Sequence, residues 1–161
     1  MAPQQPYTIL IVEDSATMRY AYSQVLEERY HLIFADNPLT ALTEVATKRP
    51  DVVLLDINLR SLRPTAQIDA NQVAKYMDGL DVCAAIKRSP YKDIPVILLT
   101  ERDGLIDKVR GKLARADCYL TKPISSDFLI AKVRDFLTAR SGATDAVQEA
   151  GLQPQAKSRL L

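Results

Sequence analysis

Strand-like runs that end in polar side chains constrain the fold of this chain more than any other feature. Short apolar runs with polar boundaries are typical of strands buried on both faces of a parallel sheet. The polar residues at the ends of the runs are Glu13 and Asp14, Asp56, Thr100, and Lys122. In an open parallel sheet, functional groups gather outside the carboxyl ends of the strands. We therefore expect these residues to meet in one pocket.

Segments with helical spacing alternate with the runs. Ser15 is a candidate N-cap for the first helix, and Asn37 followed by Pro38 is a natural start for the second. Repeated strand–helix units predict a doubly wound α/β fold, in which a parallel sheet carries helices on both faces. Strands are expected at about 7–12, 31–35, 51–56, 94–100 and 117–121, and helices at about 15–29, 37–48, 79–88, 103–114 and 125–139.

The composition is that of an ordinary soluble domain, with 25% charged and 47% hydrophobic residues. A net charge of +1 gives no reason to expect nucleic-acid binding. No apolar stretch approaches the roughly 20 residues that span a bilayer, and the N-terminus lacks the pattern of a secretory signal. We expect a cytoplasmic protein without membrane insertion. One domain at 7–139 would lie between a flexible N-terminus at 1–6 and a flexible tail at 140–161.

The cysteines and the histidine are expected to be structural. Cys83 and Cys118 lie singly among apolar residues, without metal-binding spacing, so we expect two reduced thiols packed as small hydrophobic groups. His31 begins a strand-like segment away from the acidic run ends. A histidine nucleophile or a histidine metal site is therefore not expected.

The segment between Asp56 and Gly79 interrupts the alternation. Connections of this kind usually take about 2–6 residues, and this one is several times longer. Within it, Asp69 and Gln72 have the spacing of a capping box, and the residues that follow Asp69 favour a short amphipathic helix. The insertion, at about 60–76, is either a functional element beside Asp56 or a tolerated surface insertion.

The acidic run ends predict a magnesium site. Glu13 and Asp14 are adjacent at one strand end, where their charges repel unless a cation is present. Mg²⁺ prefers oxygen ligands and bridges carboxylates to phosphate oxygens. Lys122 can pair with Asp56 and then with a phosphoryl oxygen, while Thr100 can donate a hydrogen bond to another oxygen. These groups together favour phosphoryl transfer.

These residues and their surroundings resemble the receiver domain of two-component response regulators. The resemblance covers about residues 7–139 and implies a flavodoxin-like receiver fold. That fold is a five-stranded parallel sheet in the order 2-1-3-4-5, here with an insertion after the third strand. The segment 103–113 is also similar, more weakly, to regulators of cyanobacterial motility. The matching segments are Ile9–Ser15, Leu54–Leu59, Met77–Leu80, Pro95–Thr100 and Tyr119–Pro123.

The resemblance implies a phosphoacceptor and a metal site. Asp56 would accept a phosphoryl group from a histidine kinase or a phosphotransfer protein. Asp14 would bind Mg²⁺, or Mn²⁺ in its place, directly, and Glu13 would bind it directly or through water. Asp56 and the backbone carbonyl of Asn58 would complete the protein ligands.

The resemblance also implies a conformational switch. Thr100 and Lys122 would bind the phosphoryl oxygens, and the Lys122–Pro123 peptide would be cis. After phosphorylation, Thr100 would move toward Asp56 and Tyr119 would enter the vacated space. The face formed by the fourth helix, the fifth strand and the last helix would then change shape and bind an output protein.

Two arginines are candidate modulators of the phosphoryl group. Arg60 lies four residues after Asp56, where the family usually has proline. Arg102 lies two residues after Thr100, where the family tunes its dephosphorylation rate.

Two alternative functions remain open. A phosphatase of the haloacid dehalogenase type also uses a strand-end aspartate, but it needs a second acid where this chain has Asn58. An interaction module on a receiver fold would need no phosphate. We expect instead a signalling phosphoacceptor that is not an enzyme. It would act as a stand-alone monomer or weak dimer, in the manner of chemotaxis or pilus-motility regulators.

Overall fold

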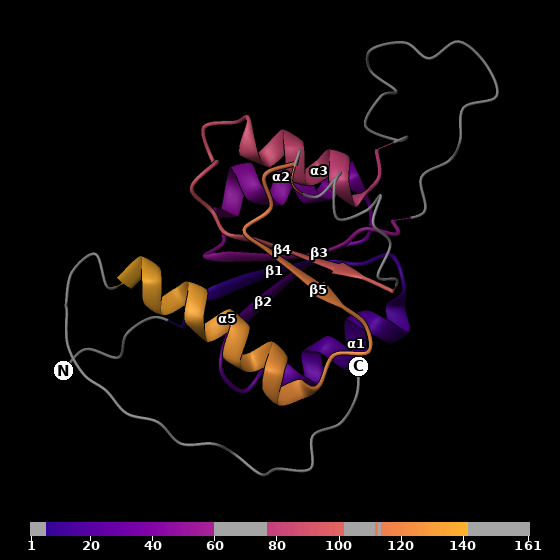
Figure 1. Cartoon of the computed structure of the whole chain (residues 1–161), viewed down its shortest axis with the longest axis vertical. Helices are drawn as coiled ribbons and strands as arrows, with labels where there is room; N and C mark the ends of the chain where they lie inside the picture. Colours follow the sequence, from indigo (N-terminus) through magenta and orange to yellow (C-terminus); the bar gives the residue numbers. More distant parts are fainter. Residues whose placement is uncertain (1–5, 60–76, 102–111, 113, 142–161) are drawn as a thin grey trace.

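The computed structural model describes residues 6–59, 77–101, 112 and 114–141. Over these residues strands and helices alternate as far as the fourth strand, and the last helix follows the fifth strand (Figure 1). The strands are β1 (Thr8–Val12), β2 (His31–Ala35), β3 (Val52–Asp56), β4 (Val96–Thr100) and β5 (Cys118–Thr121). The helices are α1 (Ala16–Leu26), α2 (Pro38–Lys48), α3 (Gly79–Lys87) and α5 (Ser126–Ser141).

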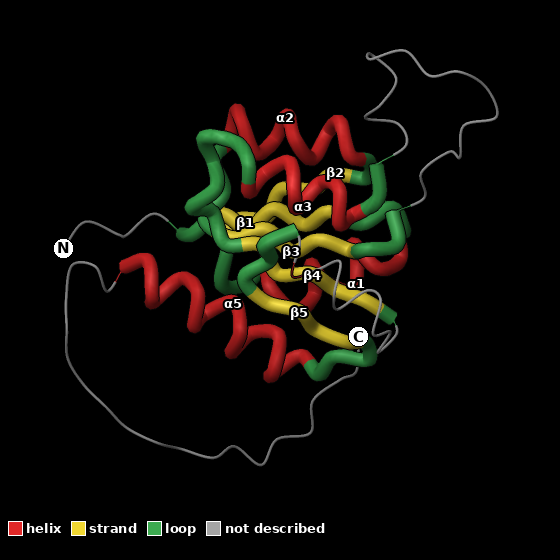
Figure 2. Tube along the Cα trace, turned by 45° about the horizontal axis from the view of Figure 1, so that its top comes forward, coloured by secondary structure: helices red, strands yellow, loops and turns green. Residues whose placement is uncertain are grey.

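The strands form one parallel sheet in the order β2-β1-β3-β4-β5, which confirms the predicted topology. Figure 2 shows this sheet as a single layer between helices. The three central strands are buried along nearly their whole length, whereas β2, at one edge, is partly exposed. The central strands therefore need apolar side chains on both faces, which is why they are continuous apolar runs.

The helices begin where local capping signals predict. Ser15 is the N-cap of α1, and its hydroxyl accepts a hydrogen bond from the Met18 N–H. Asn37 caps α2 in the same way, with Pro38 at the first helical position. Arg49 then ends α2 in the left-handed conformation. These caps satisfy N–H and C=O groups that the helix ends would otherwise leave unpaired.

Each face of the sheet has its own hydrophobic core. Helices α2 and α3 cover one face, and α1 and α5 cover the other (Figure 1). From α5, Leu129, Val133 and Leu137 are buried as the helical spacing predicts, and Phe136 is partly buried. With both faces covered, the open edge at the carboxyl ends of the strands is where polar groups can gather.

Three predicted boundaries are wrong by a few residues. The first helix ends at Leu26, short of the predicted residue 29, because the Leu26 carbonyl accepts from the two N–H groups of Arg29 and Tyr30 in a tighter turn. The strand expected from residue 94 begins at Val96, because the Ile94 carbonyl accepts a hydrogen bond from a lysine side chain. The last helix continues to Ser141.

Several predictions fall on residues that the structure does not describe. These are the helix near 103–114, apart from Lys112 and Ala114, the insertion at 60–76 with its short helix, and most of the N-terminus and of the tail. The two cysteines and the histidine lie as expected. Cys83 and Cys118 are free thiols, and His31 is an exposed residue at the start of β2.

Candidate functional site

The site residues are placed by backbone hydrogen bonds that continue beyond the strand ends. The Glu13 N–H donates to the Ala35 carbonyl of β2 at 3.0 Å. The Lys122 N–H donates to the Thr100 carbonyl of β4 at 2.6 Å. Asp56 is the last residue of β3. Because the strands are parallel, these residues all lie at the same edge of the sheet.

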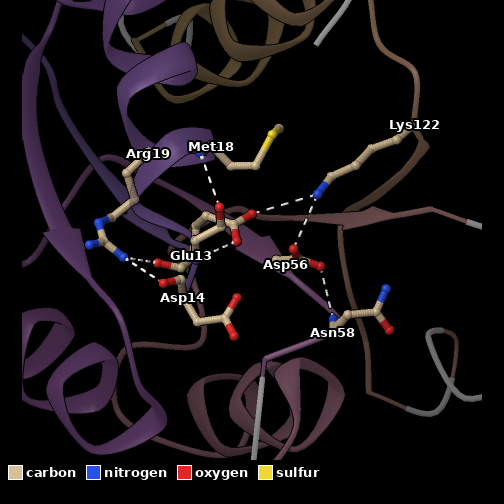
Figure 3. Close-up of polar contacts among 8 residues, drawn as sticks. Glu13, Asp14, Met18, Arg19, Asp56, Asn58 and Lys122 are labelled. Carbon is tan, nitrogen blue, oxygen red and sulfur yellow. Dashed lines mark hydrogen bonds and ion pairs between the residues drawn. The ribbon is translucent and has the colours of Figure 1, made fainter.

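Lys122 brings two of the carboxylates together. Its ammonium nitrogen Nζ lies 3.1 Å from Asp56 Oδ2 and 3.6 Å from Glu13 Oε2 (Figure 3). All three side chains are at most 9% exposed. At this burial the ion pairs are screened far less than surface pairs, so the three charges are strongly coupled.

Burial and the neighbouring Asp56 carboxylate raise the pKa of Glu13 to about 7. The Ser15 N–H, which donates to Glu13 Oε1 at 2.9 Å, and the Lys122 ammonium oppose this shift. They do not cancel it, and Glu13 Oε2 is buried without a hydrogen-bond donor. The pair of carboxylates therefore holds more negative charge than one lysine neutralises, which leaves an energetic demand for a further cation.

The Asp56 carboxylate is oriented from two sides. Oδ1 accepts a hydrogen bond from the Asn58 N–H at 2.8 Å, and Oδ2 accepts one from Lys122 Nζ. The backbone of β3 turns sharply after Asp56 to make the first of these bonds. The carboxylate is thus held at a fixed angle at the edge of the sheet.

Arg19 shapes the acidic loop, by which we mean Glu13 and Asp14 after β1. The sequence analysis missed this role of Arg19. Its guanidinium Nη1 donates to the backbone carbonyls of Glu13, at 2.7 Å, and Asp14, at 3.0 Å. These bonds fix the backbone from which the Asp14 carboxylate projects toward the side of the site where Asn58 lies (Figure 3). An arginine in the first turns of a helix that follows an acidic pair is the signal that could have found it.

Gly79 allows the closest approach of another chain segment to Asp56. Its N–H donates to the Ile57 carbonyl at 3.1 Å. A Cβ atom on Gly79 would lie 2.1 Å from the Asp56 backbone oxygen, well inside van der Waals contact. The Asp78 side chain caps α3 at the same point, with Asp81 completing a capping box. The start of α3 is therefore packed directly against the residue that ends β3.

Thr100 and Tyr119 lie on neighbouring strands. Thr100 is buried at the carboxyl end of β4 and pairs in register with Thr121 of β5. Tyr119 is partly buried and packs against the core on the side of α2 and α3. The peptide bond between Lys122 and Pro123 is cis. Arg60 and Arg102 lie outside the residues that the structure describes.

The acidic groups at this edge fit a divalent cation whose coordination shell is completed by ligands from outside the protein. In the described part of the chain, no three His, Cys, Asp or Glu side chains form a metal site by themselves. Glu13 and Asp56 share one buried site, where burial and then the neighbouring Asp56 carboxylate raise the pKa of Glu13. Hard oxygen ligands of this kind suit Mg²⁺, which usually keeps several waters and takes oxygens from a phosphate.

The chain matches known proteins over this same region. The family model of the response regulator receiver domain matches residues 9–134. Protein PilG of Pseudomonas aeruginosa is 31% identical over 128 residues, which cover 78% of this chain and 84% of that protein. Response regulator MprA of a Mycobacterium species is 34% identical over 137 residues, or 84% of this chain. The match takes in 53% of MprA, so the chain spans about half the length of that relative.

Solved structures are similar in fold. The signal receiver domain of a signal transduction histidine kinase from Syntrophus aciditrophicus is 31% identical, with a TM-score of 0.69, covering 90% of this chain and 99% of that one. The Vibrio cholerae chemotaxis protein CheY4 is 26% identical, with a TM-score of 0.66, covering 82% and 99%. In the described residues no helix is both long enough and apolar enough to span a bilayer. The sheet order, the polar edge and these matches together identify the chain as a member of the receiver domain family of two-component response regulators, which are phosphorylation-activated signalling switches.

Proposed function

We propose that Asp56 is the phosphoacceptor and takes a phosphoryl group from a phosphohistidine of a kinase or phosphotransfer protein. The observation that carries this proposal is the orientation of its carboxylate, with the Asn58 N–H on Oδ1 and Lys122 Nζ on Oδ2. A bond forms between an Asp56 oxygen and phosphorus as the phosphorus–nitrogen bond to the donor histidine breaks. Holding the carboxylate in line makes a weak nucleophile effective.

The acidic loop would hold the divalent cation that this reaction needs. Asp14, Glu13 and Asp56 would supply carboxylate oxygens, and Asn58 would supply its backbone carbonyl. Bound Mg²⁺ would neutralise charge on the phosphoryl oxygens as the group is transferred, and Mn²⁺ fits the same ligands. Arg19 supports this role, because it fixes the carbonyls of the two adjacent acids.

Lys122 and Thr100 would bind the phosphoryl oxygens. Lys122 Nζ is already 3.1 Å from Asp56 Oδ2, so a phosphoryl group on Asp56 would lie within its reach. Thr100 ends the strand next to β3, and its hydroxyl can donate to another oxygen. Lys122 would stabilise negative charge without moving far, and such preorganised donors give the largest share of most catalytic effects.

The signal would leave the site through Thr100 and Tyr119. Movement of Thr100 toward the phosphoryl group vacates space, and Tyr119 on the adjoining strand can then move inward. The face that includes β5 and α5 would change shape and bind an output protein. A population shift of this kind needs only a few kcal/mol of difference between two states.

The protein would signal rather than turn over substrate. A hydrolytic enzyme of similar chemistry needs an acid two residues after the nucleophile, and Asn58 supplies none. The only reactions at Asp56 would be its own phosphorylation and slow dephosphorylation. We place it in the cytoplasm, as a monomer or weak dimer in the manner of chemotaxis or motility regulators. One domain at 7–139 would carry this function.

The test is phosphate uptake from a small phosphodonor. Wild-type protein with Mg²⁺ and acetyl phosphate should take up one phosphoryl group, as resolved by intact mass or by a phosphate-affinity gel. Asp56→Asn should take up none, whereas Asp135→Asn, at an exposed position on α5, should behave as wild type. Uptake by Asp56→Asn at the wild-type rate would rule out Asp56 as the acceptor.

A further inference from the structure

Arg19 binds all the backbone carbonyls of the segment that connects β1 to α1. Its guanidinium Nη1 donates to the carbonyls of Glu13, at 2.7 Å, and Asp14, at 3.0 Å. Its own backbone N–H donates to the next carbonyl, that of Ser15, at 2.9 Å. Since β1 ends at Val12 and α1 begins at Ala16, no carbonyl of this connection is left to another donor. One residue of the helix therefore sets the direction of every peptide group in the connection.

The direction of these carbonyls decides where the carboxylates of the acidic loop point. Figure 3 shows the Arg19 guanidinium on one side of the loop and the carboxylates of Glu13 and Asp14 extending away from it. The Glu13 carboxylate is fixed further by the Ser15 N–H, which donates to Oε1 at 2.9 Å. Because the backbone carbonyls are used on the Arg19 side, carboxylate oxygens are what the acidic loop offers to a cation.

Charge alone gives no reason for an arginine at this position. A guanidinium stays charged at any pH at which a protein is folded, and Nη1 of Arg19 lies 3.0 Å from the Asp14 carbonyl oxygen. A positive charge beside the loop repels a cation that binds there, and this repulsion by itself lowers the affinity for the ion. If Arg19 assists cation binding, it does so through the geometry of the backbone.

We propose that Arg19 is a positioning residue for the divalent cation, because it holds the acidic loop in its ion-binding shape before the ion arrives. This inference rests on the proposed function, in which Glu13, Asp14 and Asp56 bind Mg²⁺. It adds that the affinity for the ion depends on a side chain that is not a ligand. Residues that orient metal ligands typically change metal affinity by about 10–100-fold when they are replaced.

The electrostatic and the positioning roles predict opposite effects of removing Arg19. Arg19→Met keeps the apolar stem of the side chain and removes both the charge and the donors. If charge alone mattered, the loss of repulsion would tighten Mg²⁺ binding. If the loop depends on Arg19, its two carbonyls lose their donor and the carboxylates lose their fixed direction. Mg²⁺ should then bind about 10-fold more weakly.

Arg19→Lys separates charge from geometry. It keeps the positive charge, but its single ammonium nitrogen is carried on a shorter stem than the guanidinium. We expect it to donate to the carbonyls less well than arginine does. Its affinity for Mg²⁺ should therefore lie between those of the wild type and Arg19→Met, whereas a role of charge alone predicts the wild-type affinity.

The experiment measures Mg²⁺ binding by isothermal titration calorimetry without a phosphodonor. The control is Arg29→Met, because Arg29 is exposed just beyond the other end of α1 and its replacement removes the same charge. We expect the dissociation constant to rise by about 10-fold in Arg19→Met, to rise less in Arg19→Lys and to stay unchanged in Arg29→Met. Circular dichroism checks that each variant is folded.

Phosphorylation by acetyl phosphate gives a second readout. In Arg19→Met the Mg²⁺ concentration that gives half the maximal rate should rise by about 10-fold. The rate constant at saturating Mg²⁺ should stay at the wild-type value, because the bound ion itself then holds the carboxylates in place. This separation distinguishes a positioning role in ion binding from a general loss of structure, which would lower the rate constant as well.

Two results would overturn the inference and leave the proposed function intact. One is wild-type or tighter binding of Mg²⁺ by Arg19→Met. The other, should Arg19→Met not fold, is a wild-type dissociation constant in Arg19→Lys. If the wild type binds Mg²⁺ and Arg19→Met binds it more weakly, but neither takes up phosphate, the proposed function of Asp56 fails and the role of Arg19 in ion binding stands.

Discussion

The ammonium of Lys122, which follows β5, lies 3.1 Å from Asp56 Oδ2 at the end of β3. The two residues are 66 positions apart in sequence, and their side chains meet because parallel strands end at one edge. This ion pair is buried, so it holds the Asp56 carboxylate in place. It also keeps a positive charge where the oxygens of a phosphoryl group on Asp56 would lie.

Replacement of Lys122 by Met should separate chemistry from folding. The variant keeps the length of the side chain and loses the charge that faces Asp56 and Glu13. We expect the rate constant for phosphorylation by acetyl phosphate to fall by at least about 10-fold, equivalent to about 1.4 kcal/mol. Circular dichroism should show an unchanged fold. If the variant were phosphorylated as fast as the wild type, Lys122 would have no role in phosphoryl transfer.

Lys87 provides the matched control, because it is a second buried lysine at the opposite end of the sheet. Its Nζ donates to the carbonyls of Lys92, at 2.9 Å, and Ile94, at 2.7 Å, and pairs with Asp117. Lys87→Met leaves these acceptors unsatisfied and should lower the free energy of unfolding by on the order of 3 kcal/mol. Urea denaturation measures this loss, and the phosphorylation rate of the folded fraction should stay at the wild-type value.

Substitution of Gly79 should affect the site through the backbone. The Cβ of Gly79→Ala would lie 2.1 Å from the Asp56 backbone oxygen, so the start of α3 or the end of β3 must shift. We expect the free energy of unfolding to fall by roughly 1–3 kcal/mol and phosphorylation to slow. Chemical denaturation and acetyl phosphate kinetics test both. An unchanged rate in the alanine variant would show that this contact does not position Asp56.

Mg²⁺ should stabilise the fold through the acidic loop. A ligand that binds only the native state adds about 2.7 kcal/mol at a concentration 100 times its dissociation constant. Thermal unfolding of the wild type should therefore shift to higher temperature as Mg²⁺ is added. Asp14→Asn should remove most of this shift, and Asp135→Asn should keep it. Equal shifts in all three proteins would mean that the ion binds elsewhere.

Alkaline pH should destabilise the wild type more than Tyr22→Phe. The pKa of Tyr22 is raised from its ordinary value of 10.0 to about 12, so the folded state keeps a proton that the unfolded state loses. Stability from this group is therefore lost as pH rises from about 10 to 12. Denaturation at several pH values should show a steeper loss in the wild type. Parallel curves for the two proteins would place the Tyr22 hydroxyl in an ordinary environment.

The positions of the strands and of the site could be read from the sequence because each strand carries its own signal. The buried strands are continuous apolar runs, so β3 and β4 were located to within one or two residues, and their polar ends located the site. Parallel pairing then brings Glu13, Asp56 and Lys122 together.

The contributions of Tyr22, Lys87 and Gly79 depend on tertiary contacts that no local pattern encodes. Tyr22 fits the apolar stripe of α1, so its spacing alone does not reveal that its hydroxyl oxygen is buried without a hydrogen-bond partner. Lysine is a residue type usually found at the surface, yet the side chain of Lys87 is buried and its nitrogen donates to backbone carbonyls. The close approach of Gly79 to Asp56 needs the folded backbone of both segments.

The most direct test of the central claim is to map the phosphorylated residue. Wild-type protein phosphorylated by acetyl phosphate with Mg²⁺ is reduced with borohydride, which converts an acyl phosphate into an alcohol, and its peptides are sequenced by mass spectrometry. The account predicts that the converted residue is Asp56. Conversion at Glu13 or Asp14, or a stable phosphate on His31, would contradict it.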